Sequence, residues 1–159
     1  MTAKELMKQC EAEEKELKFR EFSSETALAI GMALIEEAKK RDNKICIDIA
    51  IAGRRLFHYS SDGNAVSNDI MIERKKKTAM HTGHSSLWAH YMLEDCGMNI
   101  KEKWALEPSE YAQVGGAFPI RLENCQTVIG TITCSGFNHE QDPVSYTHLR
   151  AHETCADLV

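Results

Sequence analysis

The sequence lacks any hydrophobic run of the length that a membrane span requires, because no apolar segment approaches the ~20 residues needed to cross a bilayer. The segment from Met1 to Glu14 is charged and has no apolar core of a secretory signal. An excess of positive charge is also missing, since 24 acidic residues outnumber 19 basic ones and the formal net charge is −5. This balance argues against nucleic acid or an anionic membrane surface as a main partner. We therefore expect a cytoplasmic protein.

Paired cysteine motifs are absent too. The six cysteines fall at irregular spacings with no CxxC pair: Cys10, Cys46, Cys96, Cys125, Cys134 and Cys155. In a cytoplasmic chain this pattern favours buried thiols over a disulfide framework. A length of 159 residues with 43% hydrophobic and 27% charged residues is typical of one soluble globular domain. We expect a single domain over residues 1–143.

Proline is scarce, with three in the chain, and one of them stands in the most informative segment, residues 115–136. Gly115 and Gly116 allow a positive φ or a close approach of another group. After them, Phe118 and Ile120 alternate with Pro119 and Arg121 as in a half-buried strand. Because proline has no N–H group, Pro119 indicates an edge strand or a bulge. A turn at Asn124 and a second alternating run complete a predicted β-hairpin.

The rest of the chain predicts helices and one further hairpin. Helices are expected at about residues 3–17, from a cap at Ser23 or Ser24 to residue 41, at 68–80, and from Ser85 or Ser86 to Cys96. The alternating isoleucines of residues 45–51 form the clearest strand, and residues 54–59 form the next. Asp48 lies on the opposite face from these isoleucines, and we expect it to pair with Arg54, Arg55 or a basic helix residue. This order predicts an α+β domain with a largely antiparallel sheet.

Several motifs in this order resemble the haem-degrading domain family, whose relatives include GlcG-like and extracellular haem-binding proteins. They are Leu56-Phe57-His58-Tyr59, Arg74-Lys75, Gly83-His84-Ser85-Ser86, Gly115 to Ile120, and Ile129 to Gly136. The resemblance covers roughly residues 17–142. It implies a profilin-like fold with a five-stranded, largely antiparallel sheet flanked by helices. It also implies a homo-oligomer and, as known for some relatives, haem binding.

The C-terminal residues depart from this pattern. The string from Val144 to Thr154 resembles one reading frame of a transposase-adapter sequence used in DNA library preparation. Residues 144–159 are therefore interpreted as an artefactual tail in place of a last helix, with a divergent natural tail as the alternative. We give His148, His152 and Cys155 no functional weight.

Candidate ligand-binding residues follow from the motifs and their chemistry. The His81-x-x-His84 spacing can bind zinc, but Gly83 interrupts the helix and no third ligand is evident, so we predict no metal site. Arg74 and Lys75, in the basic run of residues 74–77, could hold a carboxylate, a phosphate or the haem propionates. Haem would also need an apolar slot and an axial ligand. The expected ligand-binding residues are His58, Arg74, Lys75, His84, Ser85, Gly115, Gly116 and Phe118.

Three functions fit these residues. The first, which we favour, is a homo-oligomeric binding module for haem or another small anionic ligand. The second is an enzyme acting on haem or another small molecule at the same site, although no catalytic residue can be assigned. The third is a protein-assembly scaffold without a ligand. A pocket shared by His58, His84 and Arg74 would favour the first two functions over the third.

Overall fold

A computed structural model describes residues 1–136 of the chain, so the expected tail at residues 144–159 lies outside the described part. The elements are α1 (Ala3–Glu16), α2 (Ser24–Lys40), β1 (Cys46–Ile51), β2 (Arg54–Ser60), α3 (Val66–Thr82), α4 (Ser86–Cys96), α5 (Ile100–Trp104), β3 (Ala117–Leu122) and β4 (Cys125–Ser135). The strands form one antiparallel sheet in the order β2-β1-β4-β3. The predicted α+β class and both hairpins are confirmed.

The sheet has four strands within residues 1–136, which corrects the expected five. The segment after α1 reaches the outer side of β3 but makes only one parallel bridge, between Phe19 and Leu122. Pairing does not extend along β3, because Pro119 has no N–H to donate and the Ala117 N–H donates to the Ser86 hydroxyl at 3.0 Å. Pro119 therefore stands on an edge strand, as its chemistry predicts.

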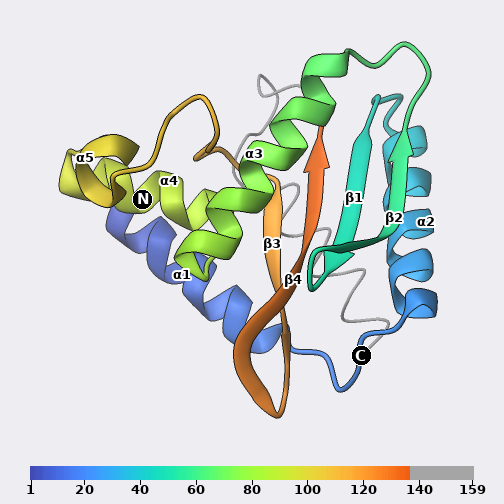
Figure 1. Ribbon diagram of the computed structural model, residues 1–159, viewed down its shortest axis with the longest axis horizontal. Coiled ribbons are helices and arrows are strands. Elements are labelled where there is room, and N and C mark those ends of the chain that lie inside the picture. The colour runs from blue at the N-terminus through green and yellow to red at the C-terminus, as the bar shows by residue number, and fades with distance from the viewer. Residues whose placement is uncertain (137–159) are drawn as a thin grey trace.

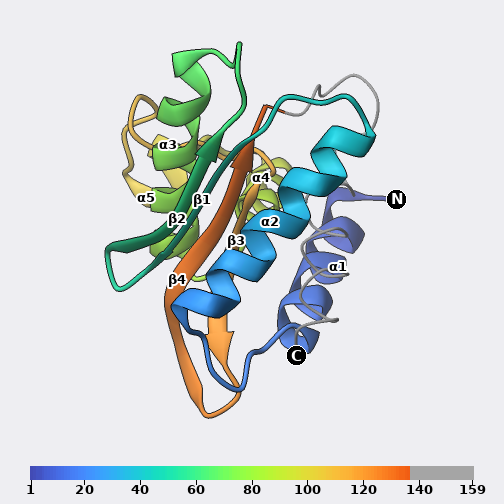
Figure 2. The same ribbon diagram turned by 90° about the vertical axis from the view of Figure 1, so that its right-hand side faces the viewer.

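Two helices cover the two faces of the sheet. Figures 1 and 2 show α2 on one face and α3 crossing the other. On the α2 side, the isoleucines of β1 pack with the apolar stripe of α2 into the main core, in which Ile30, Ile47 and Ile49 are fully buried. Because side chains alternate along a strand, the residues between these isoleucines face α3.

A second, smaller core lies beyond the β3 edge, where α1 packs on α4 (Figure 1). Cys10 of α1 meets Leu87, Trp88 and Tyr91 of α4 there. Four of the described helices begin at a polar side chain that accepts a backbone N–H: Thr2 caps α1, Ser23 caps α2, Ser85 caps α4 and Asn99 caps α5. The exception is α3, which begins at Ala65 and has no side-chain cap. Among the helices of residues 1–136, none combines the length and apolar character that crossing a bilayer requires.

Candidate functional site

The last turn of α1 and the start of α4 meet at a histidine–glutamate pair. The Glu14 carboxylate is 5% exposed, although it lies on the otherwise apolar face of α1 that also carries Cys10. Glu14 Oε2 lies 2.7 Å from His84 Nδ1, and Glu14 Oε1 accepts the Ser85 N–H at 2.7 Å. A buried carboxylate is stable only when such partners replace water, so this pair joins the two helices through charge-assisted hydrogen bonds.

The pair fixes the orientation and the tautomer of His84. A carboxylate can only accept a hydrogen bond, so the Nδ1 atom of His84 carries the hydrogen and Nε2 keeps a lone pair in the neutral ring. The imidazole also stacks on Trp88, with ring centroids 4.0 Å apart and planes 18° apart. Trp88 is held in turn by Glu11, whose carboxylate accepts the indole N–H at 3.0 Å. His84 is thus a pre-oriented nitrogen donor with one third of its side chain exposed.

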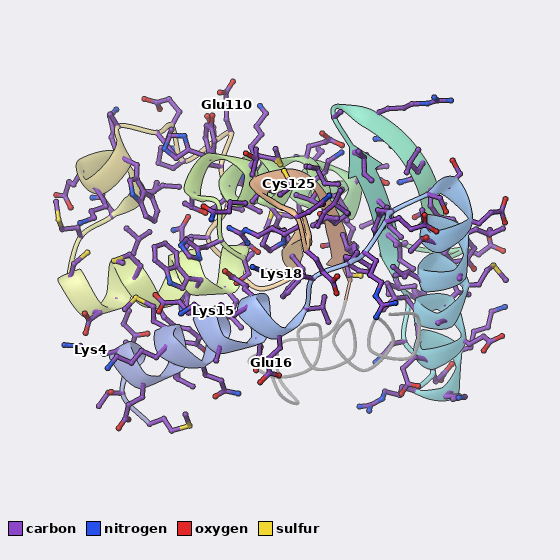
Figure 3. The ribbon with its side chains drawn as sticks, turned by 90° about the horizontal axis from the view of Figure 1, so that it is seen from below. Lys4, Lys15, Glu16, Lys18, Glu110 and Cys125 are labelled. Carbon is purple, nitrogen blue, oxygen red and sulfur yellow. The ribbon has the colours of Figure 1, made fainter. Side chains whose placement is uncertain are left out.

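An open cleft of about 380 Å³ contains this histidine. Its lining residues come from α1, the segment after α1, the segment between α3 and α4, and the β3–β4 hairpin: Glu11, Glu14, Lys15, Lys18, His84, Arg121 and Gln126. Three cations stand against two carboxylates, one of which is buried behind His84. Figure 3 shows Lys15 and Lys18 at the end of α1 nearest the hairpin and Lys4 at the far end. The cleft is locally positive in a chain of net charge −5 and favours an anion.

Arg121 of β3 connects the β3–β4 hairpin to the histidine–glutamate pair. Its guanidinium donates to the Gly83 carbonyl, and its Nη1 lies 3.9 Å from Glu14 Oε2. The hairpin expected to border the site therefore contacts the segment around His84 directly.

The predicted site residues fall in separate places. His84 lines the cleft, and Ser85 lies behind it as the buried cap of α4, accepting the Trp88 N–H at 3.1 Å. The Phe118 side chain does not line the cleft but packs in the main core under α2. Arg74 donates to the Pro108 carbonyl at 2.6 Å, on the loop before β3.

Lys75 and Gly116 meet between α3 and the sheet. Lys75 is 2% exposed and its Nζ donates to the Cys134 carbonyl at 3.0 Å. Gly116 has φ +135°, and a Cβ there would collide with the same carbonyl and with the Lys75 ammonium. Gly116 therefore provides the space that the buried lysine occupies, and Gly115 precedes it as a half-buried residue.

His58 lies near the other edge of the sheet, on β2, beside Asp48 and Asp69. Asp48 is fully buried and pairs with Arg55 (2.6 Å) and with Lys76 of α3 (2.8 Å), which confirms its expected pairing. In the described part of the chain, the structure does not bring His58, His84 and Arg74 into one pocket.

Sequence reasoning missed Glu14, Arg121 and Trp88. The pairing of Glu14 with His84 spans 70 positions and arises only when α1 docks on α4. One signal was readable: Glu14 occupies a position of the apolar helix face formed by Cys10 and Leu17, where a carboxylate needs a buried partner.

The haem degrading protein HbpS-like family matches residues 22–145. The chain belongs to this family. Its relatives include the UPF0303 protein of Edwardsiella ictaluri, 35% identical over 156 residues that cover 98% of this chain and 96% of the relative. The UPF0303 protein of Streptomyces coelicolor is 35% identical over 132 residues, covering 83% of each chain.

Solved structures share the fold of this HbpS-like chain. The crystal structure of Ybr137w protein superposes with a TM-score of 0.83 at 29% identity, covering 96% of this chain and 86% of that one. The PduOC:heme complex superposes with a TM-score of 0.65 at 15% identity, covering 87% of this chain and 94% of that one. HbpS of Streptomyces reticuli, as a double mutant, gives a TM-score of 0.64 at 17% identity, with 87% of each chain covered. At identities of 15% and 17%, the likeness to the PduOC:heme complex and to HbpS shows a common fold and no more.

Proposed function

We propose that this protein is a homo-oligomeric binding module for a small anionic ligand, which the cleft at His84 holds. The observation that carries the proposal is the combination of His84, oriented by the buried Glu14, with Lys15, Lys18 and Arg121 in one cleft. The cations attract the anion and form charge-assisted hydrogen bonds with it. The imidazole adds a nitrogen whose lone pair, or whose proton when charged, faces the ligand.

Haem is the ligand that the family suggests, and the residues of the cleft fit it in part. His84 Nε2 is a suitable axial donor, and the three cations suit the propionates. Apolar atoms form most of the surface that these residues expose to the cleft, but no apolar side chain is among the lining residues to enclose the haem ring. When bound, haem would supply an iron centre for His84 and two carboxylates for the cations. A volume of about 380 Å³ lies at the small end of ligand sites, which favours small carboxylates and phosphates as well.

A titration of the full chain with haemin, followed by the Soret band, and a calorimetric titration with inorganic phosphate test the proposal. We expect at least one of the two to bind and His84→Ala to weaken that binding at least about tenfold, or about 1.4 kcal/mol. His90→Ala is the matched control, because His90 lies on the exposed face of α4. Both variants retain His148 and His152. Any haemin that binds to those two residues would therefore contribute equally to both variants and would not produce a difference in affinity between them. Equal affinities of the two variants, or no binding of either probe, would contradict the proposal.

The same pair also supports the enzymatic alternative, because a histidine oriented by a carboxylate is the arrangement of a general base. Turnover of haemin in the presence of a reductant, lost in His84→Ala, would favour an enzyme over a binding module. Binding without turnover would favour the module.

A further inference from the structure

A group of metal-binding atoms lies at the β2 side of the sheet, away from the His84 cleft. Cys46 Sγ is 3.1 Å from Asp69 Oδ1, and His58 Nε2 is 3.5 Å from the same oxygen. One ligand atom from each of the three residues lies within 4.8 Å of the other two. Small side-chain adjustments would therefore bring a thiolate, an imidazole and a carboxylate around one ion.

The backbone holds these side chains together. Cys46 and Asp48 of β1 share the face toward α3, and the antiparallel register pairs Asp48 with His58 of β2. His58 therefore stands diagonally opposite Cys46 on the same face. Asp69 belongs to the first turns of α3, and Ile72, three residues further on the same side, is 1% exposed against the sheet. The positions of β1, β2 and α3 thus bring Cys46, His58 and Asp69 close together without an ion.

The burial of the group is graded. Cys46 is fully buried, whereas the His58 and Asp69 side chains are 34% and 42% exposed. The sulfur side is closed by protein and the opposite side opens to solvent, so an ion could enter and keep one position open. His58 Nδ1 faces the Asp48 carboxylate at 3.9 Å, and metal-binding histidines commonly direct their second nitrogen to a carboxylate. The Asp48 carboxylate forms ion pairs with Arg55 and Lys76, so we do not count it among the metal ligands.

We propose that Cys46, His58 and Asp69 bind a divalent transition metal of the Zn²⁺ class, with one coordination position open. Thiolate, imidazole and carboxylate are the ligands that Zn²⁺ takes in proteins, and three of them with an open position are typical of reactive zinc sites. On binding, the thiol proton leaves to solvent and the sulfur electron pair binds the metal, which replaces the Cys46–Asp69 hydrogen bond. No local spacing such as His81-x-x-His84 marks this group in the sequence, because its ligands lie on β1, β2 and α3.

Co²⁺ titration of the chelator-treated full chain tests the proposal, because a Co²⁺–thiolate bond has a charge-transfer absorption. The comparison uses a Cys155→Ser background, so that the tail cysteine cannot provide the thiolate. We expect one Co²⁺ per chain with this absorption, displaced by Zn²⁺, and its loss in Cys46→Ser. Asp69→Asn and His58→Gln should each weaken Co²⁺ binding at least about tenfold.

Cys96→Ser and His90→Gln are the controls, since both side chains are exposed and lie on α4. They should leave the absorption and the affinity unchanged. Circular dichroism shows whether Cys46→Ser folds. If it does not, Asp69→Asn still tests the site, because Asp69 is half-exposed and its substitution should leave the fold intact. An absence of the charge-transfer absorption, or Co²⁺ binding unchanged in both Asp69→Asn and His58→Gln, would overturn the proposal. His84→Ala should have no effect, which separates this site from the cleft.

Discussion

Lys75 is the residue at which burial and charge oppose each other most strongly. Its ammonium is enclosed between α3 and the sheet, with the Cys134 carbonyl as an acceptor at 3.0 Å. Burial lowers the pKa of Lys75 from 10.5 to about 8, because removing the ammonium from water disfavours its charged form. The family motif that contains Arg74 and Lys75 thus places one residue on a surface loop contact and the other in the interior.

This pKa predicts a pH-dependent stability. Below about pH 8, Lys75 is protonated in the folded and unfolded states, so its burial costs a constant free energy. Between about pH 8 and pH 10.5 the unfolded state binds more protons, so the free energy of unfolding rises with pH. Relative to Lys75→Met, the wild type should gain about 2 kcal/mol from about pH 7 to about pH 9.5 in urea denaturation.

Lys77→Met provides the control, because Lys77 is exposed on the same helix. The stability difference between wild type and Lys77→Met should stay nearly constant over this pH range. A difference for Lys75→Met that does not change with pH would show that the Lys75 ammonium has an ordinary pKa in the folded protein.

At the scale of elements, the local pattern of apolar and polar residues was sufficient to predict a helix or strand wherever one face of that element is buried. The alternating isoleucines predicted β1, and a cap at Ser23 or Ser24 predicted α2, because burial and capping are local signals. The structure places the cap at Ser23. The short helix α5 was missed, although Asn99 and Glu102 form its capping box. The fifth strand was expected from resemblance alone, and Pro119 together with the Ser86 contact limits that pairing to one bridge.

The candidate site was harder to predict than the elements, for a physical reason. His84 was identified from a local motif, but the partners that give it chemistry come from α1 and β3. No local rule states that α1 docks on α4. Only the buried position of Glu14 on α1 carried that information.

The docking of α1 on α4 should depend on Glu14. In Glu14→Gln the amide oxygen can accept one of the two hydrogen bonds, while the amide NH2 faces the other donor, either Ser85 N–H or His84 Nδ1–H. We expect a loss of about 1–3 kcal/mol in the free energy of unfolding. Faster amide hydrogen exchange in α1 should accompany it.

Glu21→Gln removes a carboxylate from an exposed position outside the helices and should change stability little. Equal stability of Glu14→Gln and Glu21→Gln in denaturant titrations would show that the buried pair does not hold α1 in place.

At the scale of the whole molecule, exposed apolar side chains suggest where copies of the chain associate. Val66 and Ile70 stand one turn apart on α3 and are 75% and 57% exposed. Large apolar residues at this exposure on adjacent turns are suited to a protein interface. The proposed homo-oligomer would bury them.

Light scattering after size exclusion should give the wild type a mass of at least twice that of one chain. Ile70→Glu should lower this mass, because a charge would be buried at the interface, while Lys4→Glu on α1 should not. A wild type that runs as a monomer would exclude the homo-oligomer, and an unchanged mass in Ile70→Glu would place the interface elsewhere.

The charge of the cleft can be tested with two double variants of equal charge change. Lys15→Glu/Lys18→Glu reverses two of the three cations of the cleft and leaves Arg121 in place, whereas Lys4→Glu/Lys8→Glu reverses two cations towards the other end of α1. The measurement is the affinity of each variant for the probe that binds the wild type, haemin or inorganic phosphate. The Lys15/Lys18 variant should bind at least about tenfold more weakly than the Lys4/Lys8 variant, a difference of about 1.4 kcal/mol. Equal affinities of the two variants would contradict an anion site at His84.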